Sequence, residues 1–310
     1  MIYRLKMTPV SLIVHLDHKD KSRARKTMQA ADLGSEREAH LEIAKRFVEA
    51  RLNAAPLKTY PGPVPATLED GYDIQDRAIE LWPDRVAGWK VGRIVGEAEE
   101  RLGVDRLAGP VFARTIMEAS SGRPTRVAVF DGGFAAVEGE FIVVLGKNAP
   151  PDKTSWSLAE ARMMIGSVVA GVEIASSPFP GINDFGPAVT ISDFGNNAGL
   201  IIGPELPDWR DFDFNAWACE ARVGPRLIGA MSAASIPGSP IESLRFLLEN
   251  CARRGMPAKK GQFISTGAVT GVHEIRAGEA ASFTFAGAGV IECVAAPASP
   301  ERRSKFVAAT

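Results

Sequence analysis

The sequence predicts an α+β protein whose body is rich in strands. Short apolar segments of strand length are frequent after residue 84, and Gly and Pro separate them. Few stretches show helical periodicity, and helical and strand segments do not alternate regularly, as they would around a parallel α/β sheet. With 310 residues, the chain is long enough to bury about three quarters of its unfolded surface in a core.

The N-terminal region is predicted to be helical after a charged extension. Residues 1–34 carry many charges without periodicity, and we expect an extension there, with the natural start open at Met7 or Met28. A helix is expected from Ser35, where Ser35 and Glu38 form a capping box. An apolar stripe at helical spacing follows: Leu41, Ala44, Phe47 and Val48.

A second helix is expected after a proline-rich loop over residues 54–65. Thr67 and Asp70 form its capping box, and the helix should end at about Leu81. The expected organisation is therefore the extension 1–34, a helical segment 35–82 packed on the body, and a mixed β catalytic body over 83–310.

The body is predicted to contain nine strands and two helices. The expected strands are residues 85–91, 126–130, 134–145, 168–175, 200–202, 218–223, 262–266, 281–285 and 290–295. One helix should begin at Ser157, with Glu160 completing a capping box. The other should begin at Ser239 or Pro240 and end at Gly255, a suitable C-terminal cap.

Charge and composition exclude several classes of protein. The chain has 36 basic and 37 acidic residues and no basic stripe, so we expect neither nucleic acid nor an anionic membrane as a partner. No apolar run reaches about 20 residues, and the apolar stretch 10–16 is too short and interrupted for a signal peptide. Three widely separated cysteines indicate buried thiols and favour a reducing, cytoplasmic setting.

Two glutamates on one strand are the first candidate site. Glu138 and Glu140 share one face of the strand 134–145, because side chains alternate with period two, while Val137 and Phe141 share the other. Alone, such a pair is usually a solvated strand face. Glu173 lies in a second apolar strand and needs a partner as well. Two or three carboxylates suit Mg²⁺ or Mn²⁺.

Lys90 and Asp193 are weaker candidates by themselves. Lys90 lies in a short apolar strand between glycines, where it is either a surface residue or a cation that binds a substrate carboxylate. Asp193 follows a strand-like stretch, residues 188–192, and precedes a polar turn, a common place for a capping residue. His40 is expected on a polar helix face, and the histidines form no evident metal pair. The sequence has no GxSxG, P-loop or dinucleotide fingerprint.

Several short segments stand in a fixed order along residues 35–295. They are Leu68-Glu-Asp-Gly-Tyr-Asp-Ile-Gln75, Gly88-Trp-Lys-Val-Gly92, Leu102-Gly-Val-Asp105, Val137-Glu-Gly-Glu-Phe141, Gly171-Val-Glu-Ile174, Ser192-Asp193, Gly199-Leu-Ile-Ile-Gly203 and Ser265-Thr-Gly-Ala268. Together these ordered segments resemble the fumarylacetoacetate hydrolase superfamily, in its branch of 2-keto-4-pentenoate hydratases and 4-oxalocrotonate decarboxylases.

This resemblance implies a site, a fold and a reaction. It implies a mixed β-sandwich or rolled sheet with flanking helices, usually in a homo-oligomer. It implies that Mg²⁺ or Mn²⁺ is held by three glutamates, and that two catalytic and two substrate-binding residues share their pocket. The expected residues are Glu138, Glu140 and Glu173 for the metal, Lys90 and Asp193 for catalysis, and Thr266 and Gly267 for the substrate carboxylate.

The expected activity is that of a lyase acting on a small 2-oxo acid. A hydratase would add water to a 2-hydroxydienoate and give a 4-hydroxy-2-oxo acid, with Lys90 neutralising the carboxylate or moving a proton and Asp193 as general acid/base. Segments 93–95 and 106–110 depart from the hydratase pattern, so decarboxylation of a vinylogous 2-oxo diacid and C–C hydrolysis of an acylpyruvate stay open. A non-catalytic protein that binds a small acid is the alternative of another class.

Overall fold

The computed structural model describes residues 18–120 and 122–301, and side chains from residue 34 onward. The chain divides into two compact units between Ala39 and His40, and every strand of the described residues lies in the second unit. The expectations for residues 1–17 lie outside the described residues.

The first helix differs from the prediction. Helix α1 runs from His18 to Leu52, so the expected helix start at Ser35 is wrong. Residues 18–34, expected to belong to an extension without helical periodicity, are part of this helix. Good helix formers, among them Lys, Arg, Ala, Met and Gln, dominate this stretch, so the Ser35–Glu38 pattern lies inside a longer helix. Within the second unit, Ala44, Phe47 and Val48 are buried as the predicted stripe requires.

Three other helices follow the sequence signals closely. Helix α2 spans Leu68–Leu81, with both capping-box hydrogen bonds of Thr67 present. Helix α4 spans Leu158–Arg162 behind the capping box of Ser157, and helix α6 spans Ser239–Arg253. A short helix α3 over Glu97–Leu102 was not predicted. Residues 188–192, expected to be strand-like, form helix α5 (Pro187–Ser192), whose first residue is a proline with a helical φ.

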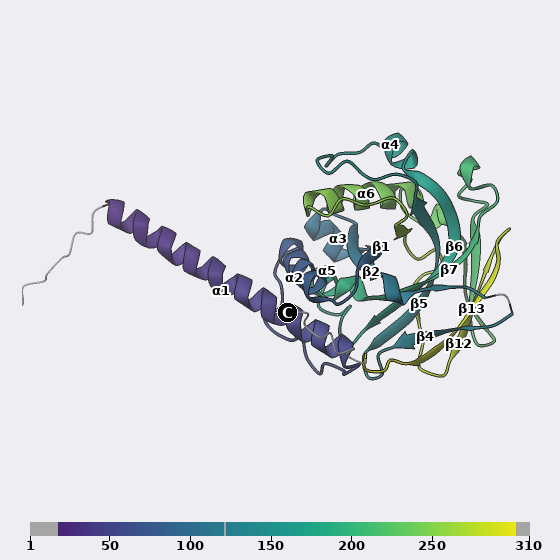
Figure 1. Ribbon diagram of the computed structural model, residues 1–310, viewed down its shortest axis with the longest axis horizontal. Coiled ribbons are helices and arrows are strands. Elements are labelled where there is room, and N and C mark those ends of the chain that lie inside the picture. Colours follow the sequence, from purple (N-terminus) through teal and green to yellow (C-terminus); the bar gives the residue numbers. More distant parts are fainter. Residues whose placement is uncertain (1–17, 121, 302–310) are drawn as a thin grey trace, which may run out of the picture. The chain divides into compact units, whose positions relative to one another are not determined.

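The larger sheet has eight strands and carries the candidate site. Its strands in sequence order are β1 Val86–Arg93, β2 Arg106–Phe112, β3 Ile116–Glu118, β5 Phe134–Leu145, β6 Ile165–Ser177, β7 Asn197–Glu205, β10 Phe263–Ser265 and β11 His273–Glu274. In space the order is β2-β1-β10-β5-β6-β7-β3, with β11 beside β5. The long strands curl across the body, with α6 and α4 over one end (Figure 1).

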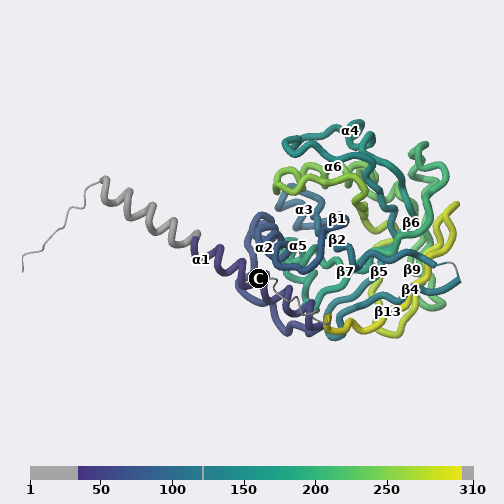
Figure 2. Tube along the Cα trace, viewed as in Figure 1, coloured from purple at the N-terminus to yellow at the C-terminus, as the bar shows by residue number. Residues whose placement is uncertain are grey.

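The second sheet has five strands and packs against the first. It contains β4 Thr125–Val129, β8 Ala218–Val223, β9 Arg226–Ser232, β12 Ala280–Phe285 and β13 Gly289–Pro297, in the order β4-β13-β12-β8-β9. The C-terminal strand β13 runs parallel to β4, far from it in sequence (Figure 2). Both sheets mix strand directions, and the predicted strand-rich α+β fold with flanking helices is confirmed.

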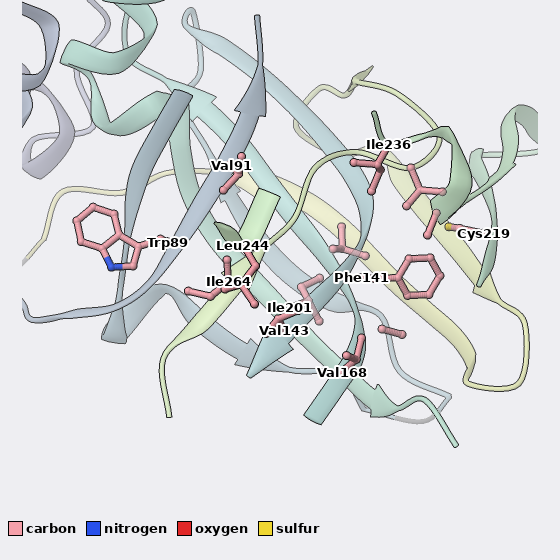
Figure 3. Packing of buried hydrophobic residues seen from close by; sticks show 14 of the residues in the cluster. Trp89, Val91, Phe141, Val143, Val168, Ile201, Cys219, Ile236, Leu244 and Ile264 are labelled. Carbon is pink, nitrogen blue, oxygen red and sulfur yellow. The ribbon is translucent and has the colours of Figure 1, made fainter. Parts of the chain in front are cut away.

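The face of β5 opposite the glutamates packs into the core between the sheets. The ring of Phe141 lies 5.4 Å from that of Trp217 and 5.5 Å from that of Phe285. A Cβ on Gly139 would lie 2.7 Å from Phe283 and 2.8 Å from the Sγ of Cys219, so only glycine permits this approach. Figure 3 shows Phe141 and Cys219 in this cluster. The glutamates of β5 are therefore forced onto the other face.

The cysteines and the apolar character of the helices were both the subject of predictions from composition. Cys219, Cys251 and Cys293 are all buried and form no disulfide, as predicted. Among the helices of residues 18–120 and 122–301, none combines the length and the apolar character that crossing a membrane requires.

Candidate metal centre

Strands β5 and β6 bring the three glutamates together. Glu138 on β5 lies directly opposite Glu173 on β6, and Glu140 follows on the same face of β5. Carboxylate oxygens of all three lie within 4.8 Å of one another, and the residues are only 6%, 0% and 0% exposed, in sequence order. Like charges directly opposite on a buried sheet face are destabilising unless a positive charge compensates them.

Two of the glutamates have one oxygen bonded and one oxygen free. The Oε2 of Glu140 accepts hydrogen bonds from Ser265 Oγ at 2.5 Å and from the Gly267 amide at 2.9 Å. The Oε1 of Glu173 accepts one from Asn197 Nδ2 at 2.9 Å. Among the described residues, Glu140 Oε1 and Glu173 Oε2 are buried without any partner. Buried polar atoms are normally satisfied, so two free carboxylate oxygens at one place fit a positively charged ligand.

Lys90 supplies part of the balancing charge. Its Nζ lies 3.4 Å from Glu173 Oε1 and donates to Asn196 Oδ1 at 3.3 Å, and the side chain is 5% exposed. Burial lowers the pKa of Lys90, but the negative charges of Glu173, Glu138 and Glu140 outweigh this, so its pKa is raised above the ordinary value. The lysine is therefore a buried ammonium group rather than the surface residue that was the alternative.

One ammonium group cannot balance three carboxylates. Burial, and then the charge of Glu173, raise the pKa of Glu138 to about 8, although Lys90 opposes the shift. Burial and both neighbouring glutamates raise the pKa of Glu140 well above its usual range. A divalent cation would cancel the two excess negative charges, and a set of oxygen donors alone is the kind that Mg²⁺ and Mn²⁺ accept. The residues thus fit a hard divalent cation.

Asp193 lies in the turn that follows α5, and both of its carboxylate oxygens accept hydrogen bonds. It has no exposed surface and pairs with Arg51, whose Nε and Nη2 lie 2.5 Å and 2.9 Å from the two carboxylate oxygens. Ser177 Oγ donates to Asp193 Oδ2 at 2.6 Å. An aspartate with both oxygens held this way is well placed to anchor neighbouring groups and poorly placed to exchange a proton.

Thr266 and Gly267 follow the end of β10, beside Glu140. The Thr266 hydroxyl donates to the Phe141 carbonyl at 2.7 Å, and the Gly267 amide donates to Glu140. Both donors are thus occupied by β5. Contact with a substrate carboxylate stays a prediction for this pair.

The chain is similar to several enzymes of known activity. No family model matches it. It is 28% identical over 237 residues to the 2-keto-4-pentenoate hydratase of Burkholderia vietnamiensis, covering 73% of this chain and 86% of the relative. It is 22% identical over 233 residues to 2-keto-4-pentenoate hydratase 1 of Dechloromonas aromatica, covering 74% and 86%. The 4-oxalocrotonate decarboxylase of Pseudomonas putida is 22% identical over 267 residues, covering 82% and 96%.

Solved structures share the fold. The 4-oxalocrotonate decarboxylase from Pseudomonas putida G7, complexed with magnesium and adipate, superposes with a TM-score of 0.69 at 21% identity, covering 84% of this chain and 98% of that one. Fumarylpyruvate hydrolase from Pseudomonas aeruginosa, in complex with Mn²⁺ and pyruvate, gives a TM-score of 0.52 at 16% identity, covering 70% and 91%. The chain thus shares the fold of these solved structures, and its sequence is similar to those of 2-keto-4-pentenoate hydratases and of a 4-oxalocrotonate decarboxylase.

Several polar residues at the site were not predicted from the sequence. Ser265 adjoins a predicted residue, and Asn196 and Asn197 stand in the polar turn after Asp193, so proximity in the sequence was the available signal. Ser177 ends β6 and binds Asp193. Arg51 lies near the end of α1, where its sequence context is that of an ordinary surface arginine, yet it is 7% exposed. Only the folded chain brings it to Asp193.

A histidine of helix α1 is also buried. His40 was expected on a polar helix face, but it is 8% exposed, because its Nδ1 pairs with Asp73 Oδ2 on α2 at 2.8 Å. No hydrogen bond or ion pair of the described residues joins this pair to the three glutamates. It therefore gives no support to a hydrolytic base at the cluster.

Proposed function

We propose that the chain is an enzyme that uses Mg²⁺ or Mn²⁺ to act on a small 2-oxo acid, and that it is a hydratase. It would add water to a 2-hydroxydienoate, by way of the 2-oxoalkenoate, and give a 4-hydroxy-2-oxo acid. The single observation that carries the metal dependence is that one oxygen of Glu140 and one of Glu173 are buried with no partner in the part of the chain that the structure describes. The similarity to several 2-keto-4-pentenoate hydratases supports the reaction class.

In this proposal Glu138, Glu140 and Glu173 hold the cation. Ser265 and Gly267 fix Glu140, and Asn197 fixes Glu173, so that one oxygen of each carboxylate would stay available to hold the ion. Hydrogen bonds of this kind orient metal-binding carboxylates in proteins generally. When bound, the divalent cation would supply Lewis-acid stabilisation of the negative charge that develops on the C2 oxygen of a 2-oxo acid.

Lys90 is the proposed catalytic residue of the chain itself. Its ammonium group lies in the cluster at 3.4 Å from Glu173, in a region almost without solvent, where its attraction for a substrate carboxylate is strong. The same Nζ, as an ammonium group, can donate a proton to the reacting part of the substrate. Asp193, expected as the general acid/base, is better explained as an anchor because Arg51 and Ser177 occupy its carboxylate.

A decarboxylase is the second candidate. Loss of CO₂ from a vinylogous 2-oxo diacid develops negative charge at the same C2 oxygen, so the same cluster would serve both reactions. The similarity to 4-oxalocrotonate decarboxylase extends over 96% of that relative, which favours this alternative over C–C hydrolysis. A non-catalytic protein that binds a 2-oxo acid would use the same cluster without turnover.

The test is a comparison of three substrates in the presence and absence of metal. The protein with Mg²⁺ is incubated with 2-hydroxypenta-2,4-dienoate, 4-oxalocrotonate or an acylpyruvate, and the decay of each chromophore is followed. We expect the dienoate to be hydrated, EDTA to abolish the reaction, and Mg²⁺ or Mn²⁺ to restore it.

Two variants separate the alternatives. Lys90→Met should reduce kcat by about 10²- to 10⁴-fold while Mn²⁺ still binds. Glu140→Gln should weaken Mn²⁺ binding itself. Full activity in EDTA would refute the metal role, turnover of 4-oxalocrotonate alone would favour the decarboxylase, and Mn²⁺ binding without turnover of any substrate would favour the binding protein.

A further inference from the structure

The turn between α5 and β7 has an unusual backbone. Three successive residues, Phe194, Gly195 and Asn196, have positive φ angles of 55°, 61° and 57°. The left-handed region is natural for glycine and tolerated by asparagine, but it is disfavoured for a bulky residue such as phenylalanine. A turn of this kind persists only where its surroundings hold it in place.

Arg51 holds both ends of this turn. At the beginning, its Nε and Nη2 bind the Asp193 carboxylate, and Nη2 also donates to the Asp193 carbonyl at 3.2 Å. At the end, its Nη1 donates to the Asn197 carbonyl at 2.9 Å. A third anchor is the Ser176 carbonyl on β6, at 3.1 Å from Nη2. The planar, branched guanidinium can reach all of these acceptors together, which an ammonium group cannot do.

Aromatic rings fix the guanidinium in this position. Its carbon lies 5.1 Å from the centre of the Phe194 ring and 5.4 Å from that of Phe130. Phe194 is itself buried against Phe112, with ring centres 4.9 Å apart. A Cβ on Gly109 would lie 2.1 Å from the Phe194 carbonyl oxygen, so the backbone of β2 packs directly against the backbone of the turn. Arg51 and the turn are thus one packed unit.

The residues of the turn reach directly into the glutamate cluster. Asn196 accepts a hydrogen bond from Lys90 through Oδ1, and Asn197 donates one to Glu173 through Nδ2. A Cβ on Gly195 would lie 3.2 Å from Lys90 Cδ, so the turn also borders the stem of the lysine. Any displacement of the turn therefore moves partners of both the proposed catalytic lysine and a proposed metal ligand.

We propose that Arg51 is a positioning residue for the site: it holds residues 193–197 in their left-handed turn and so orients Asn197 on Glu173 and Asn196 on Lys90. The proposal rests on the proposed function for its metal and substrate readouts. Arg51 contacts neither Lys90 nor the three glutamates through any hydrogen bond or ion pair of the described residues, so it acts through the turn.

The experiment measures Mn²⁺ affinity, kcat and KM for the full chain and its variants. Arg51→Met should weaken Mn²⁺ binding by about 10- to 100-fold, the usual effect of losing a residue that supports a metal ligand. Arg51→Lys keeps the positive charge opposite Asp193 but loses the hydrogen bonds to the Asp193 and Asn197 carbonyls. Compared with Arg51→Met, it should therefore restore most of the free energy of unfolding but little of the Mn²⁺ affinity. Arg245→Met is the matched control, because among residues 18–120 and 122–301 that guanidinium binds only Glu242 and Glu249 on α6. The Mn²⁺ affinity and kcat of this variant should equal those of the parent.

A double-variant cycle identifies the route of the effect. Asn197→Ala removes the bond to Glu173 and leaves Arg51 in place, and it should weaken Mn²⁺ binding to a similar degree. If Arg51 acts through Asn197, the combination of Arg51→Lys and Asn197→Ala should lose little more than the larger single loss. Losses that simply multiply, or unchanged Mn²⁺ affinity in Arg51→Lys, would overturn the proposal. If Arg51→Met does not fold, Arg51→Lys carries the test.

Hydrogen exchange separates failure of this proposal from failure of the proposed function. Amides of the peptide 193–198 should exchange faster in Arg51→Lys than in the parent, with or without metal. A parent that binds no Mn²⁺ would refute the proposed function, and exchange would still decide the role of Arg51. A parent that binds Mn²⁺, with variants equal to it in affinity and exchange, would refute only the positioning role.

Discussion

The hydroxyl of Ser265 should control metal affinity far more than stability. It donates to Glu140 Oε2 at 2.5 Å, where the only other donor among the described residues is the Gly267 amide at 2.9 Å. A hydrogen bond to a charged group contributes about 1.5–3 kcal/mol. Because a metal ligand must be ionised, Ser265→Ala should weaken Mn²⁺ binding by this free energy, which is a factor of about 10 to 100.

The stability of the metal-free protein should change much less. Burial and the neighbouring glutamates raise the pKa of Glu140 well above its usual range, so both favour the protonated form of the side chain when no metal is bound. A protonated carboxyl group has less to lose when a donor is removed, and we expect a change of about 1 kcal/mol in the free energy of unfolding. A large loss of Mn²⁺ affinity with a small change in the free energy of unfolding is what we expect of a residue that orients a metal ligand.

The assay is Mn²⁺ titration by calorimetry or electron paramagnetic resonance, with urea unfolding in EDTA beside it. Ser235→Ala is the matched control, because its hydroxyl donates to the Val269 carbonyl at 3.1 Å, on the segment that follows β10, and not to a carboxylate. Its Mn²⁺ affinity should equal that of the parent. Equal Mn²⁺ affinity in Ser265→Ala and the parent would show that this hydroxyl does not orient a metal ligand.

Three further outcomes are expected. Gly139→Val should destabilise the protein by about 1–3 kcal/mol in urea unfolding, since even a Cβ would lie 2.7 Å from Phe283 and 2.8 Å from Cys219; unchanged stability would contradict the packing described. The pKa of Glu138 is raised to about 8 from an ordinary 4.5. The protonated Glu138 side chain therefore adds its full share to the free energy of unfolding of the metal-free protein below pH 4.5, and this share is lost as the pH rises towards 8. Urea midpoints in EDTA should therefore fall over this window more steeply in the parent than in Glu138→Gln, and Mg²⁺ should reduce the fall; parallel curves would refute this. Thr67→Ala removes the capping box of α2 and should cost about 1 kcal/mol, measured by urea unfolding, with activity retained.

Local signals predicted the elements that depend on local interactions. The capping boxes of Thr67 and Ser157 mark the beginnings of α2 and α4, because the cap is formed within four residues. Strand β5 has the predicted bounds, since its alternation of apolar and polar residues reflects one face against the core. The pairing of Glu138 with Glu173 came from the family resemblance, because no local pattern specifies which strands become neighbours.

Other features depend on partners far away in the sequence. Strand β2 contains Gly109 and Pro110, which are typical of a turn, and it forms because it lies at the edge of the sheet, where proline is tolerated. The burial of Arg51 follows from acceptors that lie more than 120 residues away along the chain. Its role could not have been derived from the residues beside it.

The proposed metal centre is tested most directly by a crystal structure of the protein grown with Mn²⁺, with anomalous scattering measured at the manganese edge. We expect one peak between Glu138, Glu140 and Glu173, at about 2.0–2.2 Å from the oxygens of Glu140 and Glu173 that have no hydrogen-bond partner among the described residues. A peak elsewhere, or no peak at a Mn²⁺ concentration that supports turnover, would contradict the assignment of these three glutamates as metal ligands.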